Sequence, residues 1–248
     1  MKLKFIITSI LITIVSLLFA QDLKEFKFEK AEKLPSTINT NGEEVKPIFN
    51  SSGTVMYFVR TKHPKNIDFI SKPNNEDIWE AVKDENGNWQ EAEHESTIND
   101  KENNSIIGSG IEDHYFLLNT YQDKKHLQYG IALTKKLAEH SWSKPEIVEI
   151  PELKYQGDFY DFFISKDENI LLISIKGEDS KGEEDLYVCL NNDGKWSKPT
   201  NLGSTINSTG YEMSPYLSTD NKKLYFVIEI ERQTYRQRDR KTDRQTNR

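Results

Sequence analysis

A phrase near the start of the chain returns almost unchanged near its end, and this repetition limits the possible fold more than any other feature. Ser36-Thr37-Ile38-Asn39 matches Ser204-Thr205-Ile206-Asn207, and Ser96-Thr97-Ile98-Asn99 repeats the tetrapeptide. After the isoleucine of the first and last copies, glycine follows at +4, glutamate at +6, proline at +9 and tyrosine at +19. These residues are Gly42, Glu44, Pro47 and Tyr57 in the first copy, and Gly210, Glu212, Pro215 and Tyr225 in the last. A match in so many registers indicates repeated structural units.

Each repeat opens with an aromatic residue, and its interior has the pattern of short strands. The opening residues are Phe28, Trp89, Trp142 and Trp196, and the three tryptophans are spaced at 53 and 54 residues. In the third repeat, residues 159–164, 170–175 and 185–189 are strand-like runs separated by polar turns, and Trp196 begins a last extended segment. Only residues 133–139 show any helical periodicity.

Four short strands in each repeat predict an all-β fold, a β-propeller of four-stranded blades. About three and a half repeats are present, with a period near 54 residues, at roughly 28–88, 89–141, 142–195 and 196–231. Residues 28–33 have the pattern of a last strand, which in closed propellers often completes the final blade. A β-sandwich or an irregular β-array is the alternative. The exposed edges of an unclosed array favour dimerisation or aggregation.

The two ends of the chain differ from the repeats. Residues 1–20 have a basic start and an uncharged apolar run of about 15 residues, which is short for a membrane span and predicts a cleaved secretory signal. The alternative is an uncleaved anchor. Residues 21–231 form the predicted partial propeller, and residues 232–248, rich in Arg, Gln, Thr and Asp, form a predicted disordered basic tail.

Charge and cysteine content exclude some classes of function. The tail carries seven basic and two acidic residues, whereas residues 21–231 carry 24 basic and 38 acidic residues, a net charge of −14. An acidic body argues against a nucleic-acid partner. The one cysteine, Cys189, lies in an apolar run, which predicts a small buried residue rather than a nucleophile.

The residues around the last repeat resemble the WD40-like PD40 repeat proteins, relatives of the TolB propeller found in bacterial cell envelopes. The similarity covers about residues 28–230. The matching residues are Trp196, Leu202-Gly203, Ile206-Asn207, Gly210, Glu212, Pro215, Ser218, Asp220 and Leu224-Tyr225-Phe226, with Asp185-Leu186-Tyr187 for the third strand and Asp77-Ile78-Trp79 as its second copy. The resemblance implies a propeller in the cell envelope, usually of six blades and often followed by a peptidoglycan-binding domain.

Four carboxylates are the candidate binding residues. Glu44 and Glu212 recur at one place in the repeat, so they could face a common funnel and bind a cation or a sugar. The alternative is that each accepts backbone N–H bonds within its own repeat. Asp158 and Asp161 flank Tyr160, and a carboxylate pair could act as acid and base in glycoside cleavage. Solvated loop acids are the alternative for this pair.

The sequence contains no motif for a metal, a nucleophile or a phosphate, and its other repeated residues are of the kind that supports a fold. No pair of histidines has metal-ligand spacing, and there is no Gly-x-Ser-x-Gly elbow or phosphate-binding glycine loop, so the sequence predicts no metal site, no cofactor and no catalytic residue. We assign repeat-structural roles to one further set of residues. They are Trp89, Trp142, Trp196, Gly42, Gly210, Pro47, Pro215, Asp77, Asp185 and Tyr225.

The sequence thus favours a non-catalytic binding or scaffold module, exported to the periplasm, associated with the outer membrane, or secreted. Its predicted partner is a protein or a cell-wall glycan. One alternative is a carbohydrate-active enzyme, a glycosidase or sialidase-like propeller. A second is a truncated, non-functional fragment of a longer PD40-repeat protein, which the change of composition at the tail supports.

Overall fold

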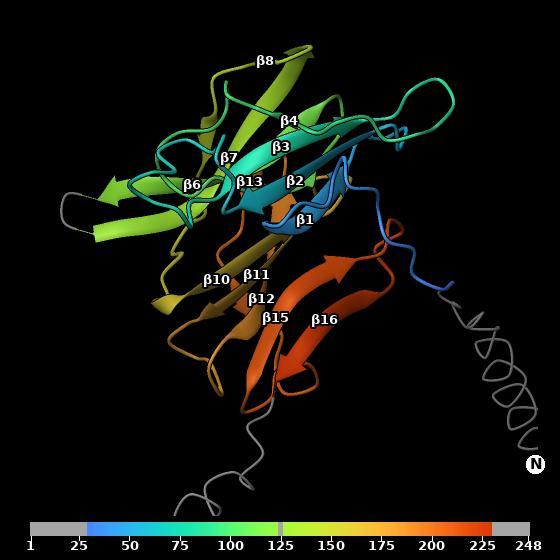
Figure 1. Cartoon of the computed structure of the whole chain (residues 1–248). Helices are drawn as coiled ribbons and strands as arrows, with labels where there is room; N and C mark the ends of the chain where they lie inside the picture. The colour runs from blue at the N-terminus through green and yellow to red at the C-terminus, as the bar shows by residue number, and fades with distance from the viewer. Residues whose placement is uncertain (1–28, 124–125, 230–248) are drawn as a thin grey trace, which may run out of the picture. The chain divides into compact units, whose positions relative to one another are not determined.

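The computed structural model describes residues 29–123 and 126–229, except for the side chains of residues 119–129 and 158 (Figure 1). The predicted signal at 1–20, Phe28 and the predicted tail at 232–248 lie outside the described residues. The chain divides into two units, Met1–Leu34 and Pro35–Arg248, and every strand of the described residues belongs to the second. The strand expected at 28–33 is not found over residues 29–33, which form no regular element.

The described residues form antiparallel strands and no helix, which confirms the all-β prediction. Consequently no helix in this part of the chain is long and apolar enough to cross a membrane. Three sheets each begin with four strands in chain order, as a meander, and a fourth sheet has two strands.

The strand bounds follow the repeat. The first sheet contains β1 (Glu43–Phe49), β2 (Val55–Thr61), β3 (Asp77–Val82) and β4 (Glu93–His94). The second contains β5 (Ile106–Ser109), β6 (His114–Asp123), β7 (His126–Ala138), β8 (Ser141–Trp142) and β9 (Glu146–Val148). The third contains β10 (Gln156–Ile164), β11 (Ile170–Lys176), β12 (Asp185–Asn192), β13 (Lys195–Trp196) and β14 (Thr200–Asn201), and the fourth contains β15 (Tyr211–Leu217) and β16 (Leu224–Glu229).

The strands of the third repeat confirm the prediction from its apolar runs, because β10, β11 and β12 contain the three predicted segments. The helical periodicity at 133–139 was misleading. Residues up to Ala138 belong to β7, and Ala132 and Leu133 pair with both β6 and β9. A strand that pairs with a neighbour on each side forms backbone hydrogen bonds along both edges. This pairing overrides a weak local preference for helix.

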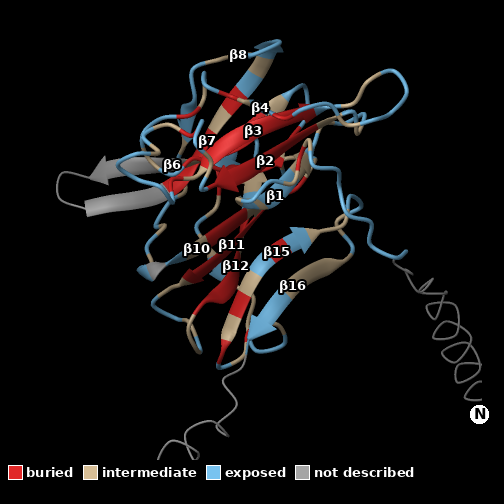
Figure 2. Cartoon of the chain, in the orientation of Figure 1, coloured by how far each residue is buried: buried red, intermediate tan, exposed pale blue. Residues whose placement is uncertain are grey.

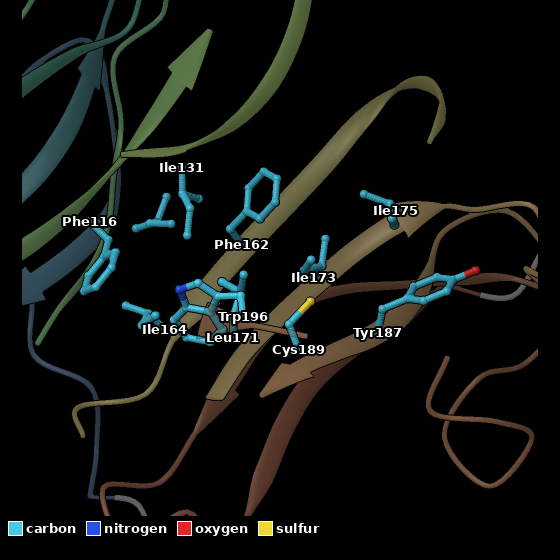
Figure 3. Packing of buried hydrophobic residues seen from close by; sticks show 11 residues of the cluster. Phe116, Ile131, Phe162, Ile164, Leu171, Ile173, Ile175, Tyr187, Cys189 and Trp196 are labelled. Carbon is cyan, nitrogen blue, oxygen red and sulfur yellow. The ribbon is translucent and has the colours of Figure 1, made fainter. Parts of the chain in front are cut away.

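Successive sheets pack face against face through apolar side chains. Tyr57 and Ile78 of the first sheet contact Ile106, Tyr115 and Leu117 of the second. A larger cluster joins the second and third sheets, and Figure 3 shows Phe116 and Ile131 beside Phe162, Ile164 and Trp196. The first strands are neighbours in chain order, since β1 contacts β5, β5 contacts β10, and β10 contacts β15. The strands in the middle of a sheet, such as β2 and β11, are the most buried parts of the described chain (Figure 2).

The two repeat prolines lie at matching irregularities of β1 and β15. The register of β1 shifts between Val45 and Ile48, and that of β15 shifts between Met213 and Tyr216, so Pro47 and Pro215 each lie within a bulge. The preceding residues, Lys46 and Ser214, have φ of 54° and 51°. Proline is tolerated at a bulge because its missing N–H costs no ladder hydrogen bond there.

Candidate functional site

A cavity of about 310 Å³ lies where the first strands of all four sheets end. Its walls come from the ends of β1, β5, β10 and β15 and from the turns that follow three of them. The lining residues are Pro47, Ile48, Phe49, Asn50, Ser51, Gly108, Ser109, Phe163, Ile164, Lys166, Tyr216, Leu217, Ser218 and Thr219. A volume of this size is at the lower end of the range that small-molecule sites occupy.

Aromatic rings and hydroxyl groups dominate this cavity. Phe49 and Tyr216 are 45% and 51% exposed, and the Tyr216 ring meets Phe163 edge to face with centroids 5.1 Å apart. Lys166 Nζ donates to Ser109 Oγ over 3.3 Å, and Ser109 Oγ donates to the Phe49 carbonyl over 3.1 Å. Among the described lining residues, Lys166 is the one charged side chain, and none is a carboxylate. The cavity can therefore stack and hydrogen-bond a polar ligand, but it contains no acid–base pair.

Asp161, a predicted binding residue, lies elsewhere on β10 and contacts the first sheet. Lys46 Nζ donates to its Oδ1 over 2.7 Å, and the Phe162 N–H donates to the same oxygen over 3.0 Å. The contact joins β1 and β10, the first strands of two sheets that are not consecutive in the chain. Asp158 also lies in β10, but its side chain is outside the described part of the structure, so the predicted Asp158–Asp161 pair is neither brought together nor separated here.

Glu44 and Glu212 make the same local contact in their own repeats. The hydroxyl of Thr40 donates to Glu44 Oε1 over 2.6 Å, and that of Ser208 donates to Glu212 Oε1 over 2.5 Å. The Thr40 N–H also donates to Glu44 over 3.2 Å. Neither side chain lines the cavity described above. Glu44 thus accepts one backbone N–H, as in the alternative to ligand binding, whereas the contact of Glu212 with Ser208 is with a hydroxyl.

Buried aspartates and asparagines repeat between sheets. The Asn99 side chain accepts from the Ile78 N–H over 2.8 Å and donates to the Ile78 carbonyl over 2.9 Å. Asn207 makes the same pair of bonds with Leu186, at 2.9 and 3.0 Å. In this way Asn99 and Asn207 each fix the third strand of the sheet that precedes them in the chain.

The two aspartates that begin these third strands are fully buried. Asp77 Oδ2 accepts from the Ile67 N–H over 2.6 Å and lies 2.6 Å from His94 Nε2. Asp185 Oδ2 accepts from the Lys181 N–H over 3.0 Å and from Asn201 Nδ2 over 2.7 Å. Both aspartates therefore satisfy backbone groups of the loop before their own strand.

The other repeat-structural residues lie as follows. Trp142 packs edge to face against Tyr57 and Tyr115, Trp196 is in the cluster of Figure 3, and Trp89 packs beside the core of the first sheet. A side chain at Gly42 would meet the Thr61 carbonyl oxygen at 2.5 Å. Gly210 donates its N–H to Ser208 Oγ over 3.0 Å, and Tyr225 lies in β16.

Sequence reasoning missed a buried polar cluster between the first and second sheets. Lys136 Nζ lies 3.0 Å from Glu95 Oε1 and 3.4 Å from both carboxylate oxygens of Glu80. Tyr57 donates to Glu80 over 2.9 Å, and Trp142 Nε1 donates to Glu95 over 3.1 Å. Glu80, Glu95 and Lys136 do not belong to the repeated phrase, so no sequence signal pointed to them. Tyr57 and Trp142 do belong to the repeat, but the repeat gave no sign of their polar contacts.

Burial determines the protonation of this cluster. It raises the pKa of Glu80 to about 6, and the hydrogen bond with Glu95 adds to the effect. Burial acts in the same direction on Glu95, but hydrogen bonds from Glu80, Lys136 and Trp142 outweigh it and lower the pKa of Glu95. Below about pH 6, Glu80 therefore holds a proton beside an ionised Glu95.

The same cluster has some features of a metal site. Ligand atoms of Glu80, Glu95 and His140 lie within 4.8 Å of one another. His140 Nδ1 is 3.3 Å from Glu95 Oε1, and its Nε2 is 3.1 Å from Glu93 Oε2. The Lys136 ammonium already occupies the space between the two carboxylates, and it would repel a second cation. These residues therefore form a saturated ionic network rather than an open metal site.

Comparisons with known proteins give no family for the chain. No protein-family model matches it, and no curated protein matches it. Among solved structures, Drosophila Semaphorin 2a is similar, with 13% sequence identity and a TM-score of 0.33. That match covers 82% of this chain and 45% of the semaphorin chain, so this chain spans less than half of that protein's length.

Proposed function

We propose that the chain is an exported β-propeller binding module of the bacterial cell envelope, without catalytic activity. The arrangement of the sheets supports a propeller, since each repeat is an antiparallel meander and the first strands are neighbours in chain order. The resemblance to PD40 repeat proteins supports the envelope as its location. The secretory pattern of residues 1–20 supports export.

The cavity at the ends of the first strands supports a glycan of the cell wall as the ligand, and it is the observation on which the proposal depends. Half-exposed Phe49 and Tyr216 offer rings for stacking on a sugar, and Ser51 and Thr219 offer hydroxyls. Lys166 offers one positive charge for an acidic sugar or for the carboxylate of a wall peptide. A site with a few polar groups among apolar walls is typical of small-ligand recognition.

Isothermal titration calorimetry with soluble peptidoglycan fragments tests this proposal. Tyr216→Ala should weaken binding about tenfold or more, because stacking contacts of one ring contribute about 1 to 2 kcal/mol. Phe159→Ala is the matched control, since Phe159 is 43% exposed but does not line the cavity. Binding that neither substitution alters, or no binding at millimolar concentrations, would contradict the glycan proposal.

Hydrolysis assays separate this proposal from the enzyme alternative. A glycosidase that uses Asp158 and Asp161 should lose its activity in the Asp158→Asn and Asp161→Asn variants. A binding module should hydrolyse no glycan before or after these changes. For the fragment alternative, we expect a non-cooperative thermal transition, whereas a folded module should melt in one cooperative step.

A further inference from the structure

The strand β16 has the sequence of a strand in the middle of a sheet, but its side chains are as exposed as those of an edge strand. The repeat aligns Val227 and Ile228 with Val59 and Arg60 of β2 and with Ser174 and Ile175 of β11. The four residues of β2 and β11 are between 0% and 2% exposed, whereas Val227 is 52% exposed and Ile228 is 48% exposed. Figure 2 shows the same contrast, with β2 and β11 largely buried and β16 intermediate along its first half and exposed along its second.

The three strands also differ in how many neighbouring strands they pair with. β2 pairs with β1 and β3, and β11 pairs with β10 and β12. β16 pairs with β15, and no other described strand pairs with it. An apolar strand edge that no other strand covers is a template for the addition of a strand.

The residues of β16 are complementary to those of a second β16 that runs in the opposite direction. If Phe226 lies on a two-fold axis, Leu224 faces Ile228 and Tyr225 faces Val227 of the other strand. In the same register, Lys223 faces Glu229 at both ends of the pair. Opposite charges at directly opposed positions of antiparallel strands stabilise the pairing, and like charges destabilise it.

We propose that two copies of this chain associate by antiparallel pairing of their β16 strands, which makes one sheet of the order β15-β16-β16-β15 across a two-fold axis. The second copy supplies the backbone partners that β3 supplies to β2. It also covers Val227 and Ile228, the apolar side chains that the first copy leaves exposed. A two-fold interface of this kind is closed, so it yields a dimer rather than a fibre.

A charge exchange tests the register. Sedimentation equilibrium of the full chain over a concentration series should give a species of twice the 28.9 kDa chain mass. Lys223→Glu or Glu229→Lys alone turns two attractive pairs into two repulsive pairs, so each should weaken the dimer about tenfold or more. The double variant, Lys223→Glu with Glu229→Lys, restores opposite charges and should restore the dimer. Ile70→Lys is the control, since Ile70 is 96% exposed and lies in a loop.

Cross-linking tests the position of the axis. Phe226→Cys brings two thiols together across the proposed axis, so a short bis-maleimide should link two copies. Ile147→Cys, at a 57% exposed position of β9, should give no such link. The native Cys189 is fully buried and does not interfere.

The outcomes decide the proposal separately from the glycan proposal, because β16 contributes no residue to the cavity. A wild-type monomer at every concentration would overturn it, and would leave the strand edge to a different partner. A dimer whose affinity is unchanged by Lys223→Glu and by Glu229→Lys would also overturn it, since the copies would then associate through another surface. Loss of glycan binding would not bear on it.

Discussion

Asn104 and Glu212 occupy the same position in two repeats and differ in what their side chains can donate. The Asn104 N–H donates to the Glu76 carbonyl over 2.7 Å, and the Glu212 N–H donates to the Glu184 carbonyl over 2.8 Å. Asn104 Nδ2 also donates to Asp77 Oδ1 over 3.3 Å. An ionised glutamate has no hydrogen to donate.

The consequence is seen at Asp185, which corresponds to Asp77. Asp185 Oδ1 and Glu212 Oε2 are both buried acceptors for which the described residues supply no hydrogen-bond partner. Burying an acceptor without a donor costs about 1 to 3 kcal/mol. Glu212→Gln supplies an amide donor of the same length, and we expect it to raise the free energy of unfolding by about 1 kcal/mol at pH 7. Urea denaturation followed by tryptophan fluorescence measures the change.

The same substitution at Glu44 should have the opposite sign. Arg60 is 2% exposed, and its Nε donates to Glu44 Oε1 over 3.0 Å while its guanidinium stacks 4.1 Å from the Trp79 ring centroid. Glu44→Gln leaves this buried cation with a neutral acceptor, so it should lower the free energy of unfolding by about 1 to 3 kcal/mol. If both substitutions destabilise the protein equally, the unpaired oxygen of Glu212 has no energetic consequence.

The sequence predicted the parts of the structure that repeat. The matching phrases predict strands in their correct order and structural roles for Asp77 and Asp185. Both aspartates are buried and accept an N–H from the loop before their own strand. Each of these features depends on residues within one repeat unit or at the start of the next. Such contacts recur at fixed sequence spacing, which makes them visible without a structure.

Contacts between distant, unrepeated residues could not be predicted. Lys46 meets Asp161 across 115 residues, and Lys136 meets Glu80 across 56 residues. No periodicity links these residues, since each pair depends on how two sheets pack. The cavity was missed for the same reason, because its walls come from four separate strand ends.

The protonation of Glu80 should make stability depend on pH. Its pKa of about 6 in the folded protein exceeds the ordinary value of 4.5, so the folded state binds the proton more tightly than the unfolded state does. The contribution of this group to stability is complete below about pH 4.5 and is lost as the pH rises through 6. The difference in pKa corresponds to a loss of roughly 2 kcal/mol.

Glu80→Gln should remove this part of the pH dependence, because the amide stays neutral over the whole range. Denaturation at a series of pH values from 4.5 to 7.5 measures the slope. Glu85→Gln is the control, since Glu85 is exposed and lies outside this cluster, so its loss should leave the slope unchanged. Equal slopes in the wild type and Glu80→Gln would show that Glu80 is not protonated in the folded state.

Cys189 should be unreactive in the native protein. It is fully buried, and burial raises the pKa of its thiol to about 12, so almost no thiolate is present at pH 8. We expect a thiol-specific reagent such as Ellman's reagent to label the native chain only at the rate of unfolding, and to label the chain at once in denaturant. Fast labelling without denaturant would mean that the third sheet opens locally.

Asn99 should contribute more to the stability of the protein than an exposed asparagine does. It is 8% exposed, and its side chain satisfies both the N–H and the carbonyl of Ile78. Asn99→Ala leaves two buried backbone groups without these partners, so it should lower the free energy of unfolding by about 2 to 4 kcal/mol. Asn88→Ala is the matched control, because Asn88 is exposed and its side-chain amide donates to the loop residue Asp84 over 3.3 Å. A loss below 1 kcal/mol at Asn99 would mean that water replaces the amide, and that consecutive sheets are joined mainly by their apolar contacts.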